Sequence, residues 1–151
     1  MHSACFFALV SVSAASLVAN VNSKEPEYCQ HLTNTYMSAW EFADSVVASC
    51  NQERGPKNCM VFGTMWSSNF RNDLSKISAA LGCGSETAPM DLETACSLIT
   101  NIGQTSTKVL REIFQDMKGS KLSSVADEVI PDLEKMAQTL VKPVKADFCN
   151  L

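Results

Sequence analysis

The stretch that decides the fold is Asp91–Met117, which reads DLETACSLITNIGQTSTKVLREIFQDM. Its apolar residues recur at steps of three and four, and this spacing places them on one face of an α-helix. Asp91 and Glu93 stand at the expected start of that helix, where the helix dipole favours acidic side chains. Gly103 lies within the pattern and indicates either a kink or close packing against a neighbour. The apolar stripe comprises Leu92, Ala95, Cys96, Ile99, Ile102, Val109, Leu110, Ile113, Phe114 and Met117.

Three further stripes of the same period flank this one, at residues 29–50, 59–81 and 122–148. The polar run Asn51–Asn58 contains Gly-Pro and predicts a loop, whereas Gly82 predicts a helix C-cap. Pro131 interrupts the last stripe, and the simplest interpretation is a helix that restarts there after a shorter one. The sequence therefore predicts an all-α, up-down bundle of four main helices, with the fourth split at Pro131.

The first 23 residues contain no Asp, Glu, Lys or Arg and hold the apolar run Ala4–Val10. This run is too short to span a membrane comfortably and has the size of a signal-peptide core. We expect cleavage before Lys24, which leaves residues 24–151 as a secreted, soluble, extracellular domain. No second apolar stretch of the chain reaches spanning length.

Six cysteines remain after that cleavage, and an even number in a short exported chain is typical of a disulfide framework. Cys29 and Cys50 lie about 31 Å apart along a continuous helix, too far for a disulfide. Antiparallel packing instead brings Cys50 to Cys59 at one end of the bundle, and we predict that pair. Three pairings stay open for the four cysteines at the other end, Cys29, Cys83, Cys96 and Cys149. Neighbouring helices favour Cys29–Cys149 with Cys83–Cys96.

The inventory of reactive groups argues against an enzyme. His31 is the single histidine after Lys24, and its place off the apolar stripe indicates an ordinary surface residue. No metal-binding, nucleotide-binding or nucleophile motif occurs in the sequence, so we expect no metal and no cofactor. The net charge of −4 and the lack of a basic cluster argue against nucleic acid as a partner.

Binding is therefore the expected function, in one of two forms. Met37, Phe42 and Met65 lie off the main stripes, where apolar groups can anchor an extracellular protein partner. The alternative is a carrier of a lipid or other hydrophobic small molecule, held in a helical cavity. The aromatic residues that would line such a cavity are Tyr36, Trp40, Trp66 and Phe70.

Overall fold

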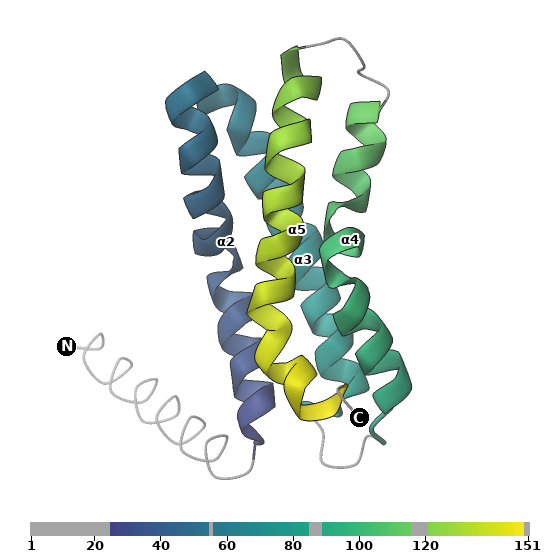
Figure 1. Ribbon diagram of the computed structural model, residues 1–151. Helices are drawn as coiled ribbons and strands as arrows, with labels where there is room; N and C mark the ends of the chain where they lie inside the picture. The colour runs from purple at the N-terminus through teal and green to yellow at the C-terminus, as the bar shows by residue number, and fades with distance from the viewer. Residues whose placement is uncertain (1–24, 55, 85–88, 116–120, 150–151) are drawn as a thin grey trace, which may run out of the picture.

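Four long α-helices packed side by side make up the part of the chain that the computed structural model describes (Figure 1). The description covers residues 25–54, 56–84, 89–115 and 121–149, without the side chains of residues 49–54, 56–59 and 121–124. The predicted helical bundle is confirmed, and no strand occurs within those ranges. The predicted signal peptide, residues 1–23, lies outside the described residues. The helices are α2 (Glu27–Arg54), α3 (Pro56–Ala80), α4 (Leu92–Gln115) and α5 (Lys121–Phe148).

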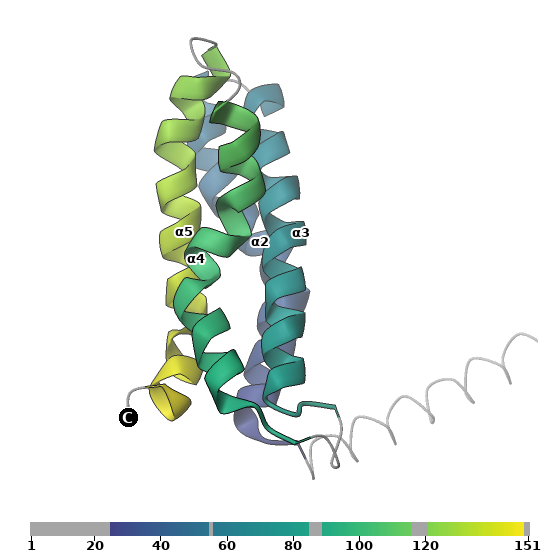
Figure 2. The same cartoon turned by 90° about the vertical axis from the view of Figure 1, so that its right-hand side faces the viewer.

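Each helix packs against its neighbours in the sequence, and α5 also packs against α2. Figure 2 shows α4 between α5 and α3, with α2 behind. The apolar stripes face one another in a single core, as their spacing predicts. The largest fully buried side chains include Trp66, Phe62 and Phe70, all from α3. No helix in the described ranges is both long enough and apolar enough to cross a membrane.

Two predicted interruptions of the helices are wrong. α2 continues to Arg54 and α3 begins at Pro56, so most of the predicted 51–58 loop is helical. Proline suits the first position of a helix because the N–H it lacks would have no partner there. α5 also runs unbroken through Pro131 and Pro143. A proline inside a helix costs about 3 kcal/mol, and the burial of Ile130 and Leu133 beside Pro131 offsets that cost.

Two disulfides join cysteines at one end of the bundle, where α2 and α4 begin and α3 and α5 end. The Cα atoms are 5.6 Å apart in Cys29–Cys83 and 5.5 Å apart in Cys96–Cys149. The expected gathering of these four cysteines at one end is confirmed. The favoured pairing of Cys29 with Cys149 and of Cys83 with Cys96 is wrong. Each disulfide instead joins the two helices of one sequence-adjacent pair.

The C-cap of α3 explains the pairing of Cys83. Gly82 and Gly84 have positive φ angles of 73° and 83°. The Gly82 N–H donates to the Ala79 carbonyl at 3.1 Å and the Cys83 N–H to the Ser78 carbonyl at 2.9 Å, the Schellman pattern. This turn brings Cys83 against the start of α2. The predicted Cys50–Cys59 pair involves side chains outside the description, and it stays a prediction.

Candidate functional site

The three residues predicted to anchor a protein partner do not form one surface. Met37 is 70% exposed on α2, whereas Met65 of α3 is half-buried against the core. Phe42 lines a groove between α2 and α5. Phe42 is five positions after Met37 in the helix, so their side chains point about 140° apart around the helix axis. Met37 and Phe42 therefore belong to two separate flanks of α2.

The four aromatic residues proposed for a cavity also divide between environments. Trp66 and Phe70 are fully buried in the core and stack with ring centroids 4.6 Å apart. Tyr36 lies under the Arg71 guanidinium, 4.3 Å from ring centroid to Cζ, in a cation–π contact. Trp40 is 43% exposed at the surface. Trp66 and Phe70 thus fill the core, and Trp40 faces solvent.

The first candidate surface is the α2–α3 flank, which we define as Met37, Trp40 and Met60. Met37 and Trp40 are three residues apart, so they share one side of α2. Trp40 and the 56% exposed Met60 line one small hollow of about 20 Å³. Gly63 lies in the same hollow, and a Cβ there would come within 3.0 Å of the Val47 side chain. Because α2 and α3 approach closely at Gly63, the large side chains of Trp40 and Met60 lie at the surface beside this contact and not within it.

The second candidate surface is the α2–α5 groove, a hollow of about 420 Å³ between these two helices. Half of its lining is apolar, and the polar half includes one carboxylate and one ammonium group. The apolar residues are Phe42, Val46, Met136 and Leu140, and the polar ones are Ser45, Asp132, Lys135 and Thr139. The volume lies within the 300–1,000 Å³ range usual for small-molecule sites.

His31 links α2 to α5 at Leu140, a lining residue of this groove, and the sequence did not reveal that contact. It is half-buried, and its Nε2 donates to the Leu140 carbonyl of α5 over 2.9 Å. Tyr28 of α2 and Phe148 of α5 meet edge-to-face beyond it, with ring centroids 4.6 Å apart. The interpretation of His31 as an ordinary surface residue is therefore wrong. His31 directly precedes the stripe residue Leu32, and this position could have indicated that His31 lies at the border of the buried face.

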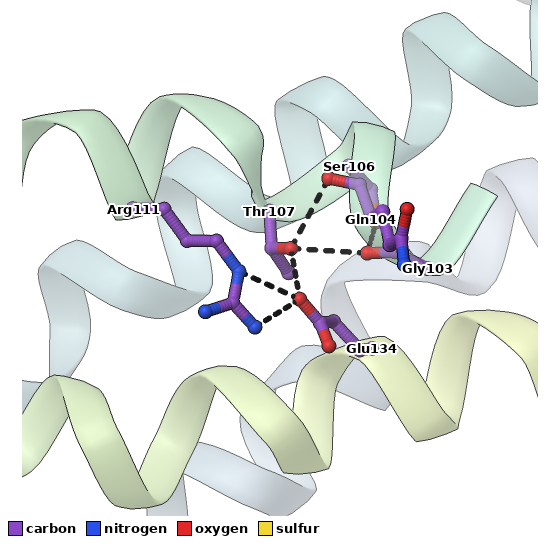
Figure 3. A network of polar contacts seen from close by, with 6 residues as sticks. All are labelled: Gly103, Gln104, Ser106, Thr107, Arg111 and Glu134. Atoms are coloured by element: carbon purple, nitrogen blue, oxygen red, sulfur yellow. Dashed lines mark hydrogen bonds and ion pairs between the residues drawn. The ribbon is translucent and has the colours of Figure 1, made fainter. Parts of the chain in front are cut away.

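On its opposite side, α5 is joined to α4 by a polar network (Figure 3). Glu134 Oε1 accepts hydrogen bonds of 2.8 Å from the Thr107 hydroxyl and from Arg111 Nε. Arg111 also pairs with the same oxygen through its terminal nitrogen. Oε1 of Glu134 already accepts hydrogen bonds from both residues of α4. The contact between the two helices therefore explains these polar side chains without a bound substrate.

Asp73 is the described carboxylate whose burial most changes its acidity. The residue is 8% exposed at the contact between α3 and α4, where the Thr105 hydroxyl donates a hydrogen bond to its carboxylate over 2.8 Å. Loss of solvation raises the pKa of Asp73, and the Thr105 hydrogen bond and the Lys76 charge oppose this only in part. No group of three or more His, Cys, Asp or Glu side chains able to hold a metal occurs in the described part of the chain.

Compared with known proteins, the chain matches no family model, no curated protein and no solved structure. The two surfaces of α2 are therefore the features of the molecule that indicate a function.

Proposed function

We propose that the protein is a secreted, non-enzymatic interaction protein that binds an extracellular protein partner through the α2–α3 flank. The observation that carries this proposal is the exposure of Trp40 beside Met60 and Met37. Tryptophan and methionine are enriched at protein interfaces relative to the rest of the surface, and tryptophan is prominent among binding hot spots.

The remainder of the molecule supports a role in the extracellular space. The disulfides Cys29–Cys83 and Cys96–Cys149 suit an oxidising compartment. The apolar run Ala4–Val10 near the start of the sequence has the size of the apolar core of a secretory signal. A scaffold stapled at one end keeps α2 and α3 in fixed positions, so a partner meets a preorganised surface.

The test begins with affinity capture from extracellular fluid, followed by calorimetric titration of the purified partner. We expect Trp40→Ala and Met60→Ala each to weaken binding at least tenfold. Val109→Ala and Ile113→Ala are matched controls, because both residues are 40% exposed on α4. The controls should bind like the wild type.

The proposal fails if Trp40→Ala, shown by circular dichroism to be folded, binds the partner with unchanged affinity. It also fails if the α4 controls lose as much affinity as Trp40→Ala, since the flank would then not be the interface. Sedimentation of the purified chain with and without Trp40→Ala shows whether the partner is a second copy.

A second candidate function, carriage of a hydrophobic small molecule, is favoured by the α2–α5 groove. Its four apolar residues and its volume of about 420 Å³ suit a small ligand. The site would lie between two helices at the surface, since Trp66 and Phe70 are fully buried in the core. Native mass spectrometry and organic extraction of the purified protein test for such a ligand.

A further inference from the structure

The α2–α3 flank has a positive charge at one end and a negative charge at the other. Tyr36, Trp40 and Asp44 follow one another at steps of four residues, so they lie along one side of α2. The Arg71 guanidinium of α3 lies over the Tyr36 ring, with its Cζ 4.3 Å from the ring centroid. Asp44 is exposed and lies about 12 Å from Tyr36 along the axis of α2. Trp40 is therefore midway between the two charges.

Neither of these charges is paired within the described part of the chain. No described carboxylate forms an ion pair with Arg71, and no described cation forms one with Asp44. Arg71 is half-buried, and its Nε is buried without a hydrogen-bond partner among the described residues. A guanidinium that has lost part of its solvation is stabilised by a carboxylate beside it. The flank therefore favours a partner that presents a carboxylate to Arg71 and a cation to Asp44.

A second copy of this chain meets that requirement. A two-fold axis that passes by Trp40, perpendicular to α2, exchanges the two ends of the stripe from Tyr36 to Asp44. It places Arg71 of each copy opposite Asp44 of the other copy, so the same charge pair forms twice. It also brings the two Trp40 side chains together at the centre of the contact, where large aromatic side chains contribute most to binding.

The other described side chains of the flank fit this arrangement. Met37 lies before Trp40 on α2 and Met60 lies beyond it beside Val47, so exposed apolar surface extends to both sides of the tryptophan. Glu41 is about 100° around the helix axis from Trp40. Its exposed carboxylate therefore lies at the edge of the contact, where solvent screens the charge.

We propose that the protein binds a second copy of itself through the α2–α3 flank. The α2 helices of the two copies lie antiparallel, and two Arg71–Asp44 pairs flank the central pair of Trp40 side chains. This proposal rests on the proposed function, because it uses the same surface, and it identifies the partner. It is independent of the α2–α5 groove, which lies on the other side of α2.

Sedimentation of the purified chain over a range of micromolar concentrations measures its self-association. We expect a monomer–dimer equilibrium whose dissociation constant Trp40→Ala raises at least tenfold. Asp44→Arg and Arg71→Glu should each weaken the dimer about tenfold, because each variant places like charges opposite each other twice. Asp127→Arg is the matched control, because it makes the same change in net charge at an exposed position of α5. This control should form dimers like the wild type.

An equimolar mixture of Asp44→Arg and Arg71→Glu tests the two-fold arrangement directly. In the mixed dimer each of the two contacts again joins one arginine to one carboxylate, so the mixture should associate within about threefold of wild type. Circular dichroism shows whether each variant is folded. If Arg71→Glu does not fold, Asp44→Arg decides alone, because Asp44 is exposed. An Asp44→Arg dimer as tight as that of the wild type overturns the proposal.

The outcomes separate this proposal from the proposed function. A chain that stays monomeric at every concentration, or a dimer that Trp40→Ala does not weaken, overturns the second copy as the partner. The proposed function still stands in that case if Trp40→Ala loses a different partner captured from extracellular fluid. If Trp40→Ala weakens neither the dimer nor the binding of a captured partner, both proposals are overturned. A mixture that associates no better than its two components overturns the two-fold arrangement.

Discussion

The two sides of α5 are built in opposite ways. Toward α4 the helices approach so closely that a Cβ on Gly103 would come within 2.9 Å of the Glu134 carbonyl oxygen. Hydrogen bonds cross this contact, from Thr107 to Glu134 and from the Gln138 side chain to the Thr100 carbonyl. Toward α2 the helices are held together near the disulfide end and leave the groove farther along.

We therefore expect one side of α5 to determine the stability of the fold and the other side to be available for binding. Where backbones meet and polar groups pair across the contact, no room remains for a ligand, and substitutions act on folding. Where the lining side chains leave a hollow, substitutions can change binding with little effect on folding. The contact of α5 with α4 and the groove between α5 and α2 therefore predict different responses to similar changes.

The largest expected effect is that of Gly103→Ala. The added Cβ would meet the Glu134 carbonyl oxygen at 2.9 Å and Gln138 Cγ at 3.2 Å, and overpacking of this kind costs about 1–3 kcal/mol. The helix propensity of alanine offsets up to about 1 kcal/mol of that cost. Urea unfolding should therefore show a net loss of about 1–2 kcal/mol. Ser45→Leu, in the groove, should stay within about 0.5 kcal/mol of wild type, and equal losses for the two variants would contradict the comparison.

A smaller effect is expected from Glu134→Gln, which removes the charge that Arg111 meets. The Arg111 side chain is 48% exposed and that of Glu134 is 23% exposed, so solvent screens the pair and the expected loss is about 1 kcal/mol. Glu112→Gln is the matched control, because the exposed Lys108–Glu112 pair at 3.9 Å lies within α4. The control should change stability by less than about 0.5 kcal/mol. If Glu134→Gln lowers the free energy of unfolding by no more than this, the polar network does not stabilise the α4–α5 contact.

The periodicity of the sequence predicted the helices but not how α5 meets its neighbours. Steps of three and four identify Ile99, Ile102 and Leu110 as buried whatever lies opposite them. The closeness of α4 and α5 at Gly103 depends on the opposing Gln138 and on the Glu134 backbone. The sequence left Gly103 open between a kink and close packing, and the structure shows the close packing.

Both the disulfides and the groove depend on the order and direction of the elements, which local sequence does not specify. Helix length alone places Cys29, Cys83, Cys96 and Cys149 at one end of the bundle. The choice of partner for Cys83 also depends on the turn at Gly82. In the same way, Phe42 was identified as off the stripe, whereas its groove partner Met136 belongs to the predicted stripe of the last helix.

The smallest expected effect is at Asp73, and it depends on pH. It tests whether a buried carboxylate at a helix contact is destabilising when it has no arginine partner. The Glu134 carboxylate accepts a hydrogen bond from an arginine, whereas the Asp73 carboxylate accepts one from the Thr105 hydroxyl. Burial raises the pKa of Asp73. The folded state therefore binds this proton more readily than the unfolded state. The unfavourable contribution of the ionised group is fully present above the raised pKa and disappears as the pH falls toward the ordinary value of 3.8.

Asp73→Asn keeps an oxygen that can accept from Thr105 and removes the buried charge. We expect the variant to melt at a higher temperature than wild type at pH 7, with the difference shrinking as the solution is acidified toward pH 4. Asp132→Asn, at an exposed position of α5, is measured beside it as the same substitution outside a helix contact. If Asp73→Asn is instead less stable at pH 7 and recovers on acidification, the charged form is favoured at this contact. A carboxylate between helices of this bundle would then need no arginine, and the contrast between Asp73 and Glu134 would be lost.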